Sequence, residues 1–159
     1  MKATTGEAFA YEVKRAAFAV SSDPGRLDVD VIHGFLARSY WAEGISREIV
    51  ERSIRHSLCF GLYEWGRQVG FARMVTDRAT YAYLADVFVL EAYRGRGLSS
   101  FLMEAVMAHP DLQGLRRFGL ATRDAHGLYR KAGFSGLAMP ERMMEIVRAD
   151  IYKKKERTS

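Results

Sequence analysis

The chain has 159 residues, enough for one domain with a sizeable core, and its 48% hydrophobic and 27% charged residues are ordinary for a globular protein. The formal net charge of +5 fits an anionic ligand, and it fits equally a surface weakly attracted to nucleic acid. The single cysteine, Cys59, excludes an internal disulfide framework and any zinc site built from several cysteines.

The N-terminal part of the chain predicts one strand followed by two helices. Residues 1–10 carry no firm pattern, whereas residues 11–20 could form a strand that ends at the turn-forming residues 21–25. Asp30 is placed to cap a first helix, in which apolar residues recur at helical spacing. Ser46 is placed to start a second helix after an interrupting glycine.

The middle of the chain predicts an antiparallel meander. Three segments, 58–64, 69–77 and 80–90, are rich in β-branched and aromatic residues and are joined by short connections. Cys59 lies among apolar residues in the first segment, and a free cysteine in such a place is usually buried and inert.

The C-terminal part predicts two helices and two more strands. A helix with one apolar face ends near His109 and Pro110, because proline cannot continue a helix. The apolar face consists of Leu98, Phe101, Leu102, Ala105 and Val106. The later elements are a strand at 117–122, a short helix at 125–132 capped by Asp124 and closed by Gly133, and a last strand at 143–148. We expect a single domain over residues 1–150, and a charged, solvated and disordered tail over residues 151–159.

Residues 86–103 pass from an apolar strand through a basic, glycine-bearing turn into a helix. Gly95 and Gly97 have no Cβ, so the backbone N–H groups there can point outward without obstruction. The first N–H groups of a helix have no partner within it and lie at the positive end of its dipole. Arg94 and Arg96 add two full positive charges. Together these features predict a pyrophosphate site.

Two common nucleotide-binding loops do not match this turn. A P-loop needs a lysine directly after its last glycine, and none follows here. A dinucleotide fingerprint needs a third glycine where the chain has Ser100, and it needs a parallel opening rather than a meander.

Two blocks of the chain match recurring motifs. Arg94-Gly-Arg-Gly97-Leu-Ser99 matches the pattern Q/R-x-x-G-x-G/A at all but the last position. Ala125-His-Gly-Leu-Tyr-Arg-Lys-Ala-Gly-Phe134 matches the pattern A-x-x-L-Y-x-K-x-G-F. With these two blocks the chain, from residue 72 to residue 134, resembles the GNAT superfamily of N-acetyltransferases, in which the first pattern is the acyl-CoA motif. The chain departs from the family where Ser99 replaces Gly or Ala, where Glu91 replaces a frequent proline, and where an asparagine is missing before the second block.

The resemblance implies an α/β (α+β) fold with a central, mostly antiparallel mixed sheet of about six to seven strands flanked by helices. It also implies acetyl-CoA as co-substrate, with no metal, and direct transfer of the acetyl group to a primary amine. The backbone of Phe88 and Val89 would contact the pantetheine arm where the fourth and fifth strands splay apart. The residues implied at the pyrophosphate are Arg94, Gly95, Arg96, Gly97, Leu98, Ser99 and Ser100.

The resemblance further implies that Tyr129 protonates the departing thiolate, although a tyrosine on an amphipathic helix can equally pack on the sheet. Asp86, a carboxylate in an apolar stretch, is the best placed general base, and its alternative role is that of a structural hydrogen-bond acceptor. Glu64, His126 and a water chain are weaker candidates for the base.

Acceptor recognition in this family usually falls between the first two helices, which here points to Tyr40 and Trp41. These aromatics could cage a cationic amine or could close the core. Arg73 could meet an acidic group of the acceptor or could form a structural ion pair.

The expected partner is a small-molecule or peptide amine, with neither nucleic acid nor membrane, and a homodimer is one option for the assembly. No apolar run is long enough to span a membrane and no secretory signal is visible, so we expect a cytoplasmic location. A catalytically inactive CoA-binding domain is the second hypothesis. A basic nucleic-acid module is the third, and no helix-turn-helix or interleaved aromatic signature supports it.

Overall fold

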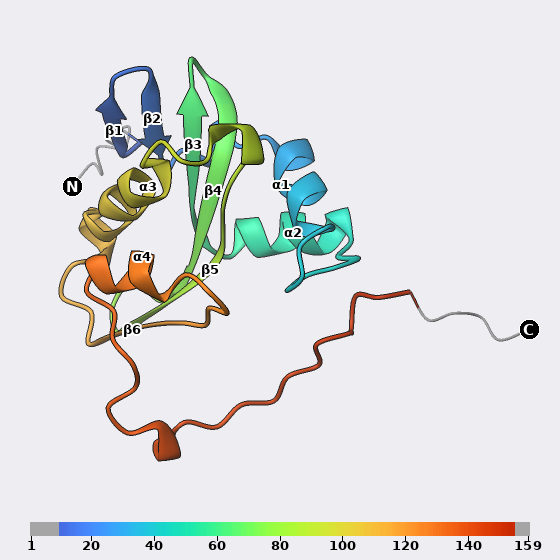
Figure 1. Ribbon diagram of the computed structural model, residues 1–159, viewed down its shortest axis with the longest axis vertical. Coiled ribbons are helices and arrows are strands. Elements are labelled where there is room, and N and C mark those ends of the chain that lie inside the picture. Colours follow the sequence, from blue (N-terminus) through green and yellow to red (C-terminus); the bar gives the residue numbers. More distant parts are fainter. Residues whose placement is uncertain (1–9, 155–159) are drawn as a thin grey trace, which may run out of the picture.

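A six-stranded sheet runs through the structure, a computed structural model that describes residues 10–154 (Figure 1). Neighbouring strands in the order β1-β2-β3-β4-β5-β6 pair antiparallel, except for β5 and β6, which are parallel. The strands are β1 Glu12–Arg15, β2 Phe18–Ser21, β3 Leu58–Glu64, β4 Arg67–Thr76, β5 Tyr81–Val89 and β6 Arg117–Leu120. This mixed sheet confirms the predicted fold class.

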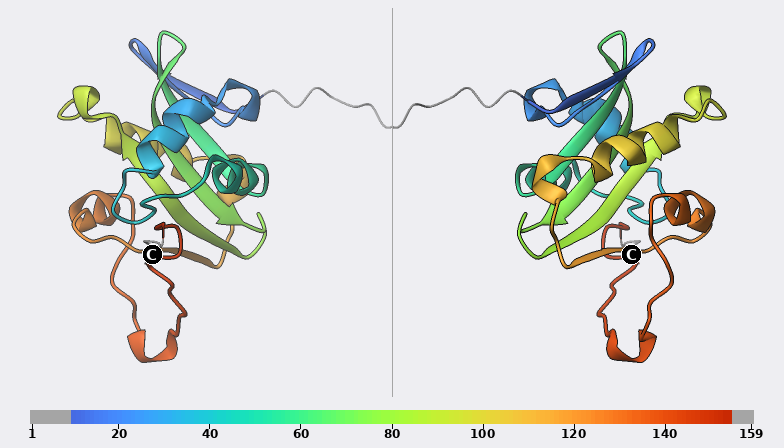
Figure 2. Two further views of the ribbon diagram at one scale, coloured as in Figure 1. Left: turned by 90° about the vertical axis from the view of Figure 1, so that its right-hand side faces the viewer. Right: turned by 90° about the vertical axis from the view of Figure 1, so that its left-hand side faces the viewer.

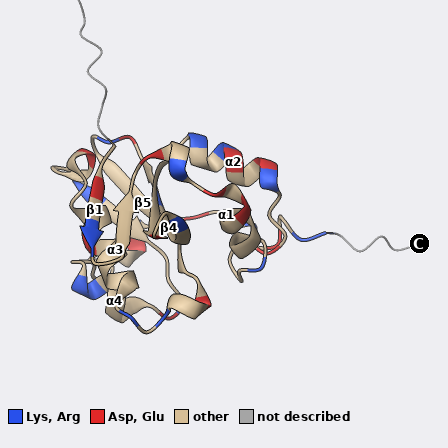
Figure 3. Cartoon of the chain, turned by 90° about the horizontal axis from the view of Figure 1, so that it is seen from above, with Lys and Arg blue, Asp and Glu red and all other residues tan. Residues whose placement is uncertain are grey.

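Helices cover both faces of the sheet, with α1 and α2 on one side and α3 and α4 on the other (Figures 1 and 2). The α-helices are α1 Val29–Leu36, α2 Arg47–Arg55, α3 Leu98–Met107 and α4 His126–Lys131. Short 3-10 helices are η1 Pro24–Arg26, η2 Glu91–Tyr93, η3 Pro110–Leu112 and η4 Pro140–Arg142. The outer surface of α2 carries both signs of charge, as expected for its solvated face (Figure 3).

Two hydrophobic cores form because successive residues of a strand point to opposite faces. Cys59 packs into the core beneath α1 and α2, whereas its neighbour Phe60 packs into the core beneath α3. Both side chains are buried, which confirms the predicted burial of Cys59.

The observed N-cap residue agrees with the predicted one for α2 and differs from it for α1 and α4. Ser46 caps α2 by accepting a hydrogen bond from the Ile49 N–H, as predicted. The cap of α1 is Asp28 rather than Asp30, because the Asp28 carboxylate reaches the N–H groups of the first turn. Asp124 does not cap α4, whose preceding N–H, that of Ala125, bonds instead to the Thr122 hydroxyl.

Two strand predictions are corrected. Residues 11–20 form most of a hairpin, β1 and β2, because the chain reverses at Ala16 with a φ of 53°. The predicted last strand at 143–148 has no regular structure and pairs with no strand of the described chain. The predictions for the central segments agree better with the structure, and β3 has the predicted bounds.

The end of the described chain returns to the body of the protein. Tyr152 is half-buried against the core beneath α1 and α2, and Lys153 pairs with Glu43 at 3.7 Å. The expectation of a fully solvated tail is therefore wrong for Tyr152. The expectations for residues 1–9 and 155–159 lie outside the described residues.

Candidate active site

A bulge in β5 places Asp86 on the face that carries α1 and α2. The register between β4 and β5 pairs Phe71 with Phe88 and Arg73 with Ala85, so β5 has one extra residue in between. Asp86 takes a φ of 55° there, a left-handed conformation that aspartate tolerates better than most residues. The bulge shifts the alternation of side chains, so Leu84 and Phe88 pack into opposite cores although they are four residues apart.

Both carboxylate oxygens of Asp86 accept hydrogen bonds. The Arg73 Nε donates to Oδ2 at 2.9 Å, and the Trp41 Nε1 donates to Oδ1 at 2.9 Å. The side chains of Arg73 and Asp86 are only 17% and 10% exposed. Arg73 also donates to the Ser57 hydroxyl at 3.1 Å. This geometry matches the structural alternatives proposed for both residues, an internal ion pair and a hydrogen-bond acceptor.

A cavity of about 510 Å³ brings together the predicted chemical residues that lie far apart in the sequence. Its lining includes Tyr40, Trp41, Asp86 and Tyr129. Glu64 and His126, the weaker candidates for the base, are not part of this lining. Sequence reasoning missed four polar residues of the cavity, namely Tyr83, Thr122, Arg123 and Asp124.

Tyr40 and Trp41 are partly exposed at the cavity, at 54% and 39%. The Trp41 ring also lies 6.2 Å from that of Phe35, which packs against the core beneath α1 and α2. The rings of Tyr40 and Trp41 meet edge-on at 5.1 Å, and the Arg123 guanidinium lies 3.8 Å from the centre of the Tyr40 ring. Arg123 of the same chain is therefore the cation that already occupies one face of the Tyr40 ring.

Tyr129 combines packing with access to the cavity. Its ring meets Phe134 edge-on at 6.1 Å at the margin of the core beneath α3. Burial, with a smaller contribution from Tyr40, raises the pKa of Tyr129 above its usual value. The hydroxyl therefore keeps its proton throughout the neutral range, as a proton donor must.

The start of α3 has the features expected of an anion site. Gly97 precedes the helix with a φ of 73° and Gly95 has a φ of 78°, and an added Cβ would meet no atom within 4 Å at either position. No side chain caps α3, so its first backbone N–H groups remain available to a ligand. These residues fit a pyrophosphate, with Arg94 and Arg96 on the same exposed turn.

Strands β5 and β6 separate at the cavity. Their pairing runs from Tyr81 and Arg117 to Leu84 and Leu120 and ends there, so residues 85–89 pair with no strand of the described chain on that edge. Because β1 and β2 form a hairpin, β5 and β6 correspond to the fourth and fifth strands of the sequence-based expectation.

The register assigns the free edge to Val89 rather than to Phe88. The Leu90 N–H donates to the Val69 carbonyl of β4, and alternate residues point their backbone groups to opposite edges. The Val89 backbone therefore faces away from β4, where its carbonyl accepts a bond from the Arg94 Nε at 3.1 Å. The Phe88 backbone faces β4, which corrects the expectation that both residues are free.

No cluster of His, Cys, Asp and Glu side chains that could hold a metal ion occurs among residues 10–154. The helices in that range are too short or too polar to cross a membrane.

A family model and a related protein point to the same family. A family model described as an acetyltransferase (GNAT) domain matches residues 55–136. A protein of Gibberella zeae named "putative acetyltransferase" is 34% identical over 142 residues, which cover 74% of this chain and 78% of that protein.

Solved structures share the fold. A crystal structure described as a "putative acetyltransferase belonging to the gnat family", from Xanthomonas campestris pv. campestris, is 54% identical, has a TM-score of 0.84, and covers 86% of this chain and 97% of that chain. A predicted acetyltransferase with acetyl-CoA, from Clostridium acetobutylicum, is 12% identical with a TM-score of 0.58, covering 82% and 94% of the two chains. At that identity the likeness shows the fold alone.

Proposed function

The chain belongs to the GNAT acetyltransferase family, and we propose that it transfers an acetyl group from acetyl-CoA directly to the primary amine of an acceptor. The acceptor is a small molecule or a peptide, and the setting is cytoplasmic. The family match also covers both sequence motifs on which the resemblance was based.

One observation carries this proposal: the free edge of β5 joins the two halves of the site. Its residues 85–87 line the cavity that holds Tyr129, and Val89 leads directly to the turn before α3. A long ligand can therefore place one end at the uncapped helix start and the other end beside Tyr129. Acetyl-CoA has such a shape, with a pyrophosphate at one end of the pantetheine arm and a thioester at the other.

The geometry supports a set of binding residues. Backbone N–H groups at the start of α3 would hold the pyrophosphate, supported by Arg94 and Arg96. The Val89 backbone would pair with the pantetheine arm, and an N–H on that edge can polarise a thioester carbonyl. Acetyl-CoA supplies the activated acetyl group.

Tyr129 would hold the proton that the departing thiolate needs. A phenol of ordinary pKa ~10 gives its proton to a thiolate whose thiol has pKa ~8.5 mildly uphill, and the raised pKa of Tyr129 makes the transfer more uphill. The transfer is feasible when it accompanies departure of the thiolate.

We infer that Asp86 positions Trp41 and Arg73 rather than acting as the base, because both of its oxygens already accept hydrogen bonds. Loss of the ammonium proton from the acceptor then falls to water in the cavity. No cysteine or serine nucleophile with a neighbouring histidine lines the cavity, which favours direct transfer over an acyl-enzyme.

A thermal-shift titration with acetyl-CoA and CoA tests the binding claim, and a panel of amines followed by free-thiol release tests the transfer. We expect acetyl-CoA to raise the melting temperature, because a ligand that binds only the folded state stabilises it. No stabilisation by either compound would overturn the proposal. Stabilisation without turnover across the panel would favour the inactive CoA-binding domain.

Replacing Tyr129 with Phe removes the proposed proton donor while keeping the ring that packs against Phe134. We expect kcat to fall by about 10²–10⁴-fold, the usual contribution of a general acid, with unchanged acetyl-CoA affinity. Tyr83→Phe, at the same cavity, serves as the control and should keep most of the activity. Equal activity of wild type and Tyr129→Phe would disprove the assigned role.

A further inference from the structure

The side chain of Arg123 brings hydrogen-bond donors to the wall of the cavity that holds Tyr129. Its guanidinium carbon lies over the Tyr40 ring, 3.8 Å from the ring centre. This cation–π contact uses the charge of the guanidinium and none of its N–H donors, which point outward in the plane of the group. The ring contact therefore holds Arg123 in place and leaves its donors to a further partner.

The pair between Arg123 and Asp124 does not use up these donors. The Arg123 Nη2 donates to the Asp124 Oδ2 at 3.5 Å, a long hydrogen bond, and the two side chains are 63% and 69% exposed. An exposed pair of this kind contributes little to stability. A ligand carboxylate can replace it, because the planar guanidinium binds a carboxylate through two parallel hydrogen bonds.

Thr122, the neighbour of Arg123, adds another donor to the same cavity. Its hydroxyl oxygen accepts a hydrogen bond from the Ala125 N–H at 3.0 Å. Because the oxygen is the acceptor in that contact, the hydroxyl proton is available to a ligand. The segment that follows β6 thus presents a cation and a hydroxyl donor side by side.

The charged side chains at the cavity balance one another. Asp86 pairs with Arg73 at 2.9 Å. Asp124 and Arg123 form the second pair. A further cation on the Tyr40 ring would be repelled by Arg123, which already lies over that ring. An acceptor that carries one positive and one negative group matches this balance, whereas an acceptor that carries several cations does not.

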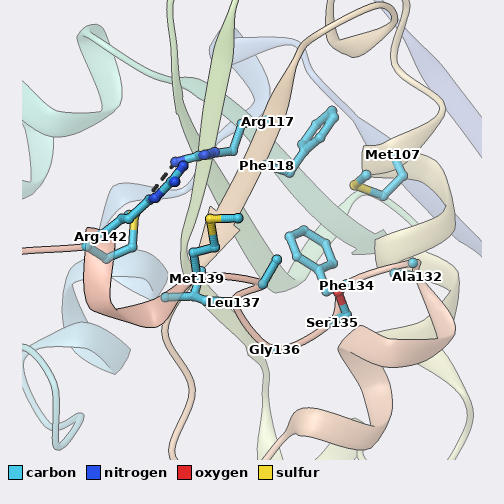
Figure 4. Close-up of a pocket in the computed structure, with 13 residues that line it drawn as sticks. Met107, Arg117, Phe118, Ala132, Phe134, Ser135, Gly136, Leu137, Met139 and Arg142 are labelled. Atoms are coloured by element: carbon cyan, nitrogen blue, oxygen red, sulfur yellow. Dashed lines mark hydrogen bonds between the residues drawn. The ribbon is translucent and has the colours of Figure 1, made fainter.

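A second hollow of similar size does not fit the acceptor. It measures about 500 Å³ and lies between β6 and residues 135–143, with Arg117, Phe118 and Phe134 in its wall (Figure 4). Neither Tyr129 nor the free edge of β5 belongs to its lining. An amine bound there would not meet a thioester that lies beside Tyr129.

We propose that the acceptor is an amino acid or a comparably small amino carboxylate, and that Arg123 binds its carboxylate while its amine faces the thioester. This inference rests on the proposed acetyl transfer and names the substrate class for it. The cavity measures about 510 Å³ and lies in the range of roughly 300–1,000 Å³ that small-molecule sites occupy. Arg123 then determines specificity, because it separates amines that carry a carboxylate from amines that do not.

The carboxylate holds the acceptor and takes no part in the bond changes. The amine nitrogen forms a bond to the acetyl carbon, and the bond between that carbon and the sulfur breaks. The ammonium group of the acceptor loses two protons in all. One of them ends on the CoA thiol by way of Tyr129, and the other goes to water.

Pairs of compounds that differ only at the carboxylate test the inference. Amino acids and the amides of the same amino acids are compared as acceptors, with thiol release as the readout. The amine of such an amide is less basic, so more of it is unprotonated at neutral pH, and a preference for the acid cannot come from the reactivity of the amine. We expect kcat/KM of the wild type to be roughly 10–100-fold higher for the preferred acid than for its amide, the usual worth of a hydrogen bond to a charged group.

Variants at Arg123 then identify the residue that recognises the carboxylate. Arg123→Gln should raise the KM for the acid to about that for the amide, while the KM values for the amide and for acetyl-CoA stay unchanged. A merely structural role would raise the KM for acid and amide alike. Arg123→Lys keeps the charge but not the planar fork, and it should recover only part of the preference. The matched control is Arg116→Gln, which removes the same charge from an exposed residue just before β6 and should keep the full preference.

The outcomes separate this inference from the proposed transfer. Faster turnover of the amides, or of amines without a carboxylate, overturns the inference and leaves the transfer intact. A preference for the acid that survives Arg123→Gln overturns it as well, because another residue would then bind the carboxylate. No turnover of either member of any pair, in a protein that acetyl-CoA stabilises, overturns the inference together with the transfer.

Discussion

At the scale of single residues, the ion pair between Arg73 and Asp86 holds one wall of the cavity, because Asp86 also accepts a hydrogen bond from Trp41. Replacing Asp86 with Asn leaves an acceptor for only one of its two donors and an unpaired cation beside it. We expect a loss of about 1–3 kcal/mol in the free energy of unfolding, measured with urea. The effect should not add to that of Arg73→Met, since residues in contact couple.

The same variant separates the two roles proposed for Asp86. A positioning role predicts a higher KM for the amine, because Trp41 loses its anchor, and an acidic limb of the pH profile that stays unchanged. A base would instead lose kcat, with the acidic limb altered. Asp124→Asn is the matched control, because Asp124 lines the same cavity but its pair with Arg123, at 3.5 Å, is largely exposed.

Cys59 gives a residue-scale prediction for alkaline stability. Burial raises the pKa of its thiol from 9.0 to about 12, so above pH 9 the unfolded chain releases this proton while the folded chain keeps it. The stability contribution of Cys59 is complete below pH 9 and is lost as the pH rises toward 12. At one pH unit above 9.0 the loss is about 1 kcal/mol. Urea unfolding at neutral and alkaline pH should show a smaller decline for Cys59→Ala than for the wild type.

At the scale of elements, the turn before α3 rests on glycines whose conformation other residues avoid. Gly97→Ala should cost about 1–2 kcal/mol of stability, because a φ of 73° is unfavourable for alanine. It should also weaken acetyl-CoA binding by about tenfold, since ~1.4 kcal/mol of lost binding has that effect. Gly114→Ala is the control: its φ is 79° and its surroundings are equally open, but it lies outside the turn. Equal acetyl-CoA affinity in the two variants, by calorimetry, would argue against the phosphate site.

The sequence predicts elements well where one local signal is enough. Cap chemistry depends on neighbouring residues, and Ser46 and Gly133, with a φ of 102°, are predicted correctly at the start of α2 and after α4. The caps of α1 and α4 are not, because more than one polar residue lies near each start and the sequence does not show which one reaches the free N–H groups. The bulge at Asp86 could not be predicted, since it is an extra residue relative to β4 and depends on the register of two strands. The segment 143–148 has the composition of a strand, yet a strand also needs a neighbour.

At the scale of the whole molecule, the cavity depends on contacts between segments far apart in the chain. Arg123 follows β6 and stacks on Tyr40 in the loop between α1 and α2, and nothing in either segment alone signals the other. Tyr129 and the turn before α3 were found because each lies in a short motif. The proposed acceptor side of the cavity has no such motif, so its polar residues emerged only from the fold.

The loop that carries Tyr40 and Trp41 is held at its far end by the end of the described chain. Gly44 has a φ of 83°, and a Cβ added there would lie 2.4 Å from the Tyr152 carbonyl oxygen. Gly44→Ala should therefore displace Tyr152 and loosen the loop. We expect the KM for the amine to rise several-fold while kcat and the KM for acetyl-CoA stay unchanged, as measured by thiol release.

Two further variants separate the anchor from backbone strain. Tyr152→Ala removes the anchor without straining residue 44, and it should raise the KM for the amine in the same way. Gly34→Ala in α1 adds a Cβ that meets no atom within 4 Å, and it should leave both KM values unchanged. Alanine in a helix is favoured over glycine by about 0.5–1 kcal/mol, so this control should also be slightly more stable. If Gly44→Ala raised the KM and Tyr152→Ala did not, strain at residue 44 would be responsible, and the chain end would have no part in holding the acceptor loop.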